Sequence, residues 1–131
     1  MEKTLVIIKP DGVKRKLMGE IIKRYENKGF NIINAKFIKA DKKTVKRHYE
    51  EHKNKDFFDE LVNYILEDFI FVMIIEGENA INIVRTINGH KDPLKALPGT
   101  IRGDFANSLT RNIIHASDSK ESSEREINIW F

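Results

Sequence analysis

The chain opens with two hydrophobic patterns in succession. Residues Leu5–Ile8 form a short, continuous apolar run, which is typical of a strand covered on both faces. The run stops at Lys9-Pro10-Asp11, and from Val13 apolar residues recur at helical spacing until Gly29. This stripe consists of Leu17, Met18, Ile21, Ile22 and Tyr25. We therefore expect a strand and then a helix that ends with Gly29 in the left-handed conformation.

The middle of the chain continues this alternation of strand and helix. Residues 32–38 place Ile33, Ala35 and Phe37 on one face, which predicts a strand half-buried through that face. A second helical stripe follows at Phe58, Leu61, Val62 and Ile65. The apolar run Phe69–Ile75 is the strongest candidate for a central strand.

The last third supplies one more helix and one more strand. Asn79 is expected to cap a helix, and Gly89 lies beyond its end. The apolar positions of this helix are Ala80, Ile83, Val84 and Ile87. Ile113 and Ile114 predict the final strand. The order βαββαβ predicts a ferredoxin-like α/β sandwich, in which helices cover the faces of a four-stranded antiparallel sheet. No repeat or linker divides residues 1–131, so we expect a single domain.

Composition narrows the possible classes of protein. The 131 residues are 40% hydrophobic and 33% charged, which suits one globular domain. Lysine and arginine number 23 against 20 acidic residues, so the net charge of +3 favours anionic ligands without implying nucleic acid. The absence of cysteine excludes disulfides and thiolate metal sites. The first ten residues hold too short an apolar run for a signal peptide or membrane span, so we expect a soluble, cytoplasmic protein.

Several familiar binding motifs are missing or incomplete. The chain has neither a P-loop nor a dinucleotide-binding glycine motif, so side chains and helix ends must hold any phosphate. The segment HYEEH, residues 48–52, places Tyr49 where a zinc protease has its glutamate, and we expect a solvated helix face there. The segment KGFNII, residues 28–33, matches the RNA-recognition motif only at its first three positions.

The clearest candidate for chemistry is His115, which directly follows the last apolar run. A lone histidine at a strand end is more often structural. A histidine nucleophile needs one free ring nitrogen and an acceptor that fixes the other. The candidates for that acceptor are Ser117, Asp118 and Glu126. Asp118 or Ser119 can also cap the helix that follows.

Cationic side chains lie at the edges of three expected elements. Lys9 ends the first strand, Arg85 lies beside an apolar helical stripe, and PGTIRGD exposes Arg102 between two glycines. Taken singly, each is more often a surface charge. If they gather around His115, they can bind a polyphosphate whose charge spreads during transfer.

Together these segments resemble the nucleoside diphosphate kinase family. The resemblance is carried by TLVIIKPDGV, HYEEH with FFDELV, PGTIRGDF, RNIIHASDS and the ending EREINIWF, in order along the whole chain. It implies transfer of a γ-phosphoryl group from a nucleoside triphosphate, usually ATP, to a nucleoside diphosphate through a phosphohistidine, with ping-pong kinetics. A nucleic-acid binding module and an interaction protein without activity are the alternatives.

The resemblance also implies roles for individual residues. His115 matches the nucleophile, and Ser117 and Glu126 match the pair that orients its ring. Lys9 and Asn112 match residues that contact the sugar 3′-hydroxyl. The remaining matches are Tyr49, Arg85 and Arg102 for the phosphates and Phe57, Leu61 and Leu109 for the base.

The residues beside these matches refine what we expect. Phe57 falls about 100° from Phe58 on a helix, so one aromatic can enter the core while the other stacks on a base of any kind. Lys91 stands where the family usually has a threonine that binds phosphate, and we expect it to bind phosphate too. Mg²⁺ is expected on the nucleotide phosphates, because no dedicated metal cage is visible. The family's subunit-contact loop corresponds to Pro93–Pro98, which implies a homo-oligomer and leaves tetramer and hexamer open.

Overall fold

The computed structural model describes residues 1–131 as one antiparallel sheet surrounded by helices. The strands are β1 (Glu2–Ile8), β2 (Asn31–Ile38), β3 (Ile70–Gly77) and β4 (Ile114–Ala116). The helices are α1 (Pro10–Lys14), α2 (Met18–Asn27), α3 (Lys42–His48), the 3₁₀ helix η1 (Glu50–His52), α4 (Phe58–Leu66), α5 (Ala80–Asn88), α6 (Ile101–Phe105) and α7 (Lys120–Trp130). The strand order is β2-β3-β1-β4 with antiparallel neighbours, which confirms the ferredoxin-like sandwich and the central place of β3.

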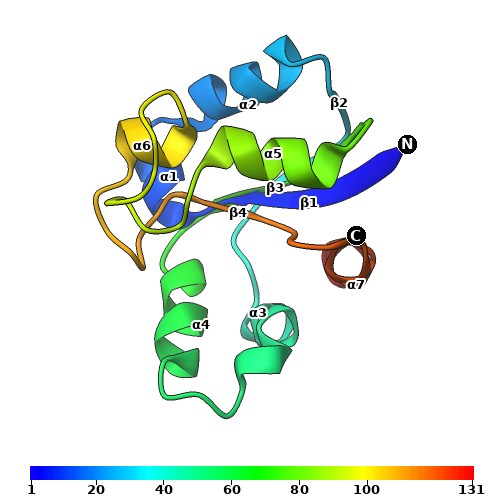
Figure 1. Cartoon of the computed structure of the whole chain (residues 1–131). Coiled ribbons are helices and arrows are strands. Elements are labelled where there is room, and N and C mark those ends of the chain that lie inside the picture. Colours follow the sequence, from blue (N-terminus) through cyan, green and yellow to red (C-terminus); the bar gives the residue numbers. More distant parts are fainter.

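Strand β1 separates two hydrophobic cores. Val6 and Ile8 pack with residues of α2 and α5, whereas Leu5 and Ile7 pack with residues of α3, α4 and α7. Figure 1 shows these two groups of helices above and below the sheet. All four strand residues are fully buried or nearly so. Burial on both faces therefore explains the continuous apolar run, as the sequence predicted.

The helix predicted from Val13 to Gly29 is in fact two helices. α1 ends at Lys14 and α2 begins at Met18, and Lys16 between them has a positive φ of 62°. Apolar spacing continues across this break, so periodicity alone did not reveal it. The left-handed glycine after α2 is confirmed, because Gly29 has a φ of 92°.

A distant carboxylate, and not Asn79, caps the start of α5. Asn79 makes no capping hydrogen bond with its side chain. Instead, Oε1 of Glu2 accepts the backbone N–H of Ile81 at 3.1 Å. Pairing of Glu2 with Gly77 brings this carboxylate to the helix N-terminus, where a negative charge is favourable. Gly89 lies directly after the helix, as expected.

The predicted inward face of β2 is wrong. Ile33 and Phe37 are 43% and 50% exposed, and Ala35 is exposed as well. The half-buried apolar residues are instead Ile32 and Ile38, which pack against one core each. A bulge between Ile32 and Asn34 leaves one extra residue in β2, and such an insertion reverses the alternation of faces after it.

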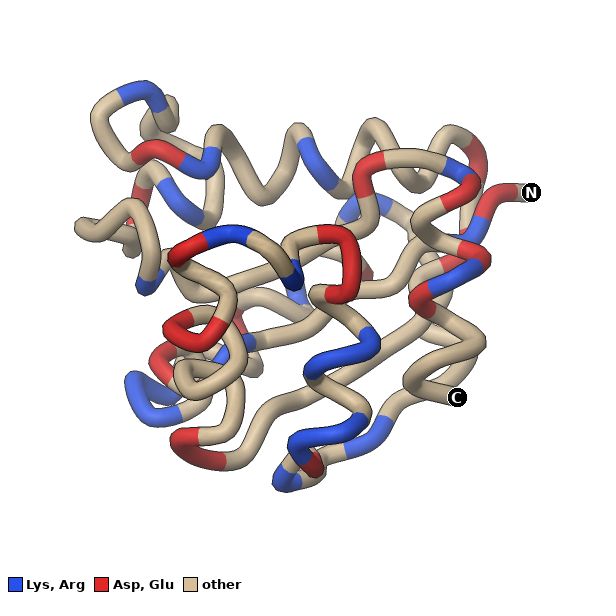
Figure 2. The backbone as a smooth tube through the Cα atoms, turned by 90° about the horizontal axis from the view of Figure 1, so that it is seen from below, with Lys and Arg blue, Asp and Glu red and all other residues tan.

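Charge is mixed over the molecule. Basic and acidic segments are interspersed along the backbone, as Figure 2 shows, and they do not separate into a basic and an acidic half. No helix in the structure is both long enough and apolar enough to cross a membrane.

Candidate active site

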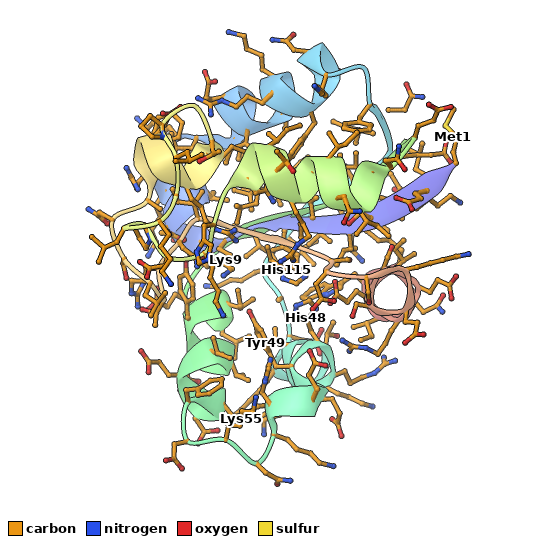
Figure 3. All side chains as sticks on the ribbon, viewed as in Figure 1. Met1, Lys9, His48, Tyr49, Lys55 and His115 are labelled. Atoms are coloured by element: carbon orange, nitrogen blue, oxygen red, sulfur yellow. The ribbon has the colours of Figure 1, made fainter.

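A cavity of about 920 Å³ lies among the ends of β1, α3 and β4 and the loops that follow α5. The predicted site residues that line it are Lys9, Tyr49, Arg85, Lys91, Arg102, Asn112, His115 and Glu126. Figure 3 shows Lys9 and His115 beneath the sheet, facing His48 at the end of α3 and Tyr49 directly after it. Segments from both ends of the chain therefore meet here, and Lys9, Arg85 and Arg102 line one cavity with His115.

The ring of His115 is held from behind by a buried carboxylate. Nε2 of His115 lies 2.8 Å from Oε1 of Glu126, and the Ser117 hydroxyl donates to the same oxygen at 2.7 Å. The side chain of Glu126 is only 6% exposed. Burial opposes its ionisation, but the hydrogen bonds from His115 and Ser117 outweigh burial and hold the pKa of Glu126 below its usual value. The carboxylate accepts a hydrogen bond from the N–H at Nε2, so Nδ1 of His115 carries the free lone pair.

Among the three predicted acceptors, Glu126 is the one that contacts the histidine. Asp118 lines the cavity but is not bonded to His115. The helix cap predicted at Asp118 or Ser119 is Ser119, whose side chain accepts the backbone N–H of Ser122 at 3.1 Å. This cap starts α7, the helix that carries Glu126 to the ring.

A strained turn places His115 at the cavity. Ile113 has a φ of 79°, which is a genuine outlier for a β-branched residue, and it lies before β4 and not within it as predicted. The N–H of Ile114 donates to the carbonyl of Asn112 at 2.8 Å, which closes a γ-turn around Ile113. Asp11 fixes this turn, because its Oδ2 accepts the N–H of Ile113 at 3.1 Å.

Two of the cations, buried Lys9 and half-buried Arg102, are hydrogen-bonded to the turn. Nζ of Lys9 donates to Oδ1 of Asn112 at 3.0 Å. Burial, aided by Arg102 and opposed by Asp11, lowers the pKa of Lys9 to about 8. Arg102 is half-buried and not exposed as expected, and burial lowers its pKa to about 10. Its guanidinium donates to the carbonyls of Gly89, Asn112 and Ile114.

The burial of His48 was not predicted from the sequence. HYEEH was expected to be a solvated helix face, but His48 is 4% exposed and its ring lies 4.6 Å from that of His115. α3 ends at His48, and His52 belongs to η1, so the two histidines do not share one helix face. The residues around HYEEH do not indicate that His48 is covered, because Trp130, which contacts it, lies 82 residues away in the chain.

Comparison with known proteins identifies the family. The family profile described as "Nucleoside diphosphate kinase" matches residues 2–131. The nucleoside diphosphate kinase of Methanocaldococcus jannaschii is 55% identical over 130 residues, which cover 99% of this chain and 93% of that protein. A crystal structure described as a nucleoside diphosphate kinase family protein from Babesia bovis is similar with a TM-score of 0.97 at 47% identity, covering 100% of this chain and 88% of that one. The chain belongs to the nucleoside diphosphate kinase family.

Membership in this family gives the class of reaction. Nucleoside diphosphate kinases transfer phosphate between nucleotides, and the general mechanism of the family is ping-pong transfer through a phosphohistidine. The chain is therefore an enzyme of the phosphotransferase class, and nucleotides are its substrates. The functional reading of the sequence is confirmed at this level.

The residues expected to hold the base of a nucleoside diphosphate lie outside the cavity lining. Phe57 is 45% exposed, and its ring is 5.6 Å from that of His52, which does line the cavity. Phe58 packs against the core formed with α3, α4 and α7 while Phe57 stays exposed, so one of the two aromatics enters the core as predicted. Leu61 is half-buried and Leu109 is 58% exposed. The structure thus brings the phosphate-binding candidates together and leaves the base-binding candidates at the rim.

Proposed function

We propose that Nδ1 of His115 carries the phosphoryl group between two nucleotides. The observation that supports this most strongly is the carboxylate of Glu126 at 2.8 Å behind Nε2, which leaves Nδ1 available to a cavity lined by cations. A nucleophilic histidine needs this arrangement, because the ring becomes cationic when its free nitrogen is phosphorylated. Glu126 balances that charge.

The reaction then consists of two matched displacements. In the first, the Nδ1 lone pair attacks the γ-phosphorus of a nucleoside triphosphate, and an N–P bond forms. The bridging P–O bond breaks, and the diphosphate leaves with its electron pair. In the second, a terminal oxygen of another diphosphate attacks the same phosphorus, and the N–P bond breaks. The ring returns to its neutral form with the proton still on Nε2.

Side chains around His115 are proposed to bind the substrate in three groups. Lys9 and Asn112 are linked at 3.0 Å and contact the sugar hydroxyl. The groups for the phosphates are Tyr49, Arg85, Lys91 and Arg102, and those for the base are Phe57, Leu61 and Leu109. Cations around the transferred group stabilise its charge as it spreads.

Mg²⁺ is proposed to arrive on the nucleotide as part of the substrate. The protein's own cluster of possible ligands is His48, His115 and Glu126, with donor atoms within 4.8 Å of one another. Two imidazoles do not suit Mg²⁺, which prefers oxygen ligands. On the phosphates, the ion would neutralise charge on the transferring group.

Labelling of the protein by a nucleotide tests the proposed function. Incubation with γ-labelled ATP and Mg²⁺ is expected to leave about one phosphate per chain. This phosphate should be labile in acid, stable in base and removed by a nucleoside diphosphate. A phosphate that survives acid would place the covalent step on another residue. A folded protein that binds ATP and stays unlabelled would show that the fold is kept without the activity.

Nucleotide affinity is expected to weaken as the pH rises above about 8. The pKa of Lys9 is about 8 in the free protein, so above it the amine is largely neutral. Lys9 must then take up a proton when an anionic ligand binds, and this uptake lowers the affinity by up to about tenfold per pH unit. Titration calorimetry with ADP between about pH 7.5 and 9.5 measures this. Lys9→Arg, which stays charged, should remove most of the dependence. A flat profile for the wild type would contradict the assignment.

Lys91 is expected to strengthen phosphate binding relative to the family's usual threonine. Its exposed side chain lines the cavity, and its ammonium is a mobile charge where threonine would offer a fixed hydroxyl. Lys91→Thr should raise KM for the diphosphate about three- to tenfold, and it should raise kcat if product release limits turnover. Steady-state kinetics tests this, with Lys39→Thr as a control, because Lys39 is an exposed loop lysine outside the cavity lining. Unchanged KM and kcat would reject the role.

The chain is also proposed to form a homo-oligomer, either a tetramer or a hexamer, in the cytoplasm. Two apolar regions are exposed in the single chain: Ile33 and Phe37 on the edge strand β2, and Leu94 and Leu97 in the loop Pro93–Pro98. Large exposed apolar residues gathered in patches are typical of interaction surfaces. Sedimentation velocity is expected to show an assembly, and Leu94→Glu should reduce its mass. A monomeric wild type would contradict this.

A further inference from the structure

His48 is a buried histidine beside the proposed nucleophile that the mechanism above does not use. Its ring lies edge-on to that of His115, with an interplanar angle of 81° and 4.6 Å between centroids. It also packs edge-on against Tyr49 and Trp130. Figure 3 shows His48 at the end of α3, directly facing His115. A rigid ring in this position limits how the His115 imidazole can turn.

Trp130 determines which nitrogen of His48 carries a proton. The indole Nε1–H, which can only donate, lies 3.0 Å from Nδ1 of His48. Nδ1 must therefore accept, and in the neutral ring the proton sits on Nε2. No protein group accepts a hydrogen bond from Nε2, and His48 lines the cavity.

The charges that face His48 favour the neutral ring. Burial, followed by the nearby His115, Arg125 and Lys9, holds the pKa of His48 well below its usual value, and only Glu126 opposes them. The carbonyl of His48 also accepts from Arg125 at 3.5 Å, which keeps this cation close.

A charged His48 would disturb the pair that holds the nucleophile. Donor atoms of His48, His115 and Glu126 lie within 4.8 Å of one another. A cationic His48 would attract the carboxylate away from Nε2 of His115, and it would repel the positive charge that develops on the phosphorylated ring. The same tautomer argues against a metal on these three residues, because Nε2 of His48 would have to lose its proton to Nδ1, which faces the indole N–H.

We propose that Trp130 fixes His48 as a neutral imidazole in one tautomer, and that His48 in turn positions the His115 ring for attack. This inference rests on the proposed role of His115. His48 is thus a positioning residue, and Trp130 at the end of α7 acts on the nucleophile through it. Because His48 stays neutral, this arrangement adds no charge to the site.

The first test removes the ring of His48. His48→Ala is expected to slow the single-turnover phosphorylation of His115 by roughly 10²-fold, because a misplaced nucleophile loses about that much. The dissociation constant for ADP should stay within about twofold, since ground-state binding does not use His48. His48→Gln, which can accept from Trp130 and donate to the cavity, should recover part of the rate. A rate close to that of the wild type in His48→Ala would overturn the proposal.

The second test asks whether Trp130 acts through the charge of His48. Trp130→Phe keeps an aromatic ring but removes the donor, so Nδ1 of His48 becomes free to take a proton. The ratio of its phosphorylation rate to that of the wild type should fall as the pH is lowered, because burial and the nearby cations still oppose a charge on His48 but the indole N–H no longer blocks Nδ1. Using the ratio at each pH cancels the pH effects that the two proteins share.

A double variant provides the matched control. In Trp130→Phe with His48→Ala, the ratio to His48→Ala alone should not change with pH, because the titrating ring is gone. A flat ratio for Trp130→Phe, or a pH dependence that persists in the double variant, would overturn the proposal. If the wild type takes up no label at His115, the proposed function itself fails. A labelled wild type with unaffected His48 variants rejects only this inference.

Discussion

Replacing His115 by asparagine is expected to abolish the covalent intermediate and reduce kcat by at least about 10⁴-fold. Asparagine has no nitrogen lone pair that can attack phosphorus, so no N–P bond can form. Its amide can still accept or donate near Oε1 of Glu126, which lies 2.8 Å from the histidine ring in the wild type. The side chain is 22% exposed, so the change should leave the fold and the substrate affinity largely intact.

Parallel labelling of the wild type and the variant measures this effect. His115→Asn should take up no acid-labile phosphate, while its thermal unfolding and ADP affinity remain close to those of the wild type. His90→Asn, which removes an exposed histidine that also lines the cavity but is not bonded to His115, should be labelled normally. Label on His115→Asn in the same amount as on the wild type would show that another residue carries the phosphoryl group.

The central part of the fold was predictable because its signals are local. β1 and β3 are buried on both faces, and such strands appear as continuous apolar runs that need no tertiary knowledge. The face of β2 was not predictable, because a bulge at Ile33 moves every later side chain to the other face. The cap of α5 was hidden for another reason: Glu2 reaches it from a position 79 residues away in the chain.

The site shows the same division between local and distant information. His115 and a carboxylate behind it were expected from the residues, whereas most of the phosphate- and base-binding roles came only from the family resemblance. Arg102 was expected to be exposed because glycines flank it, yet the carbonyls of Gly89, Asn112 and Ile114, which come from other elements, enclose its guanidinium. His48 was missed because Trp130, which covers it, lies 82 residues further along the chain. Contacts of this kind depend on the whole fold.

Replacing Glu126 by glutamine is expected to lower kcat by roughly 10²–10⁴-fold with little change in KM. The carboxylate can only accept, so it requires a proton on Nε2 of His115 and a lone pair on Nδ1. Glutamine can present its NH₂ group instead, which favours the opposite tautomer and puts the proton on the attacking nitrogen. It also removes the negative charge that balances the phosphorylated ring.

Comparison with Ser117→Ala separates the loss of the carboxylate from the loss of a hydrogen bond to it. That variant loses the hydrogen bond of 2.7 Å to Glu126 and the one of 3.2 Å from the N–H of Leu5, but it keeps the carboxylate, so its rate should fall only about tenfold. Single-turnover phosphorylation measures both variants, and ¹⁵N spectra of His115 report which nitrogen is protonated. For Glu126→Gln we expect a larger share of the Nδ1–H form. A glutamine variant within about threefold of the wild-type rate would mean that the tautomer of His115 is fixed elsewhere. The charge behind the ring would then contribute little to transfer.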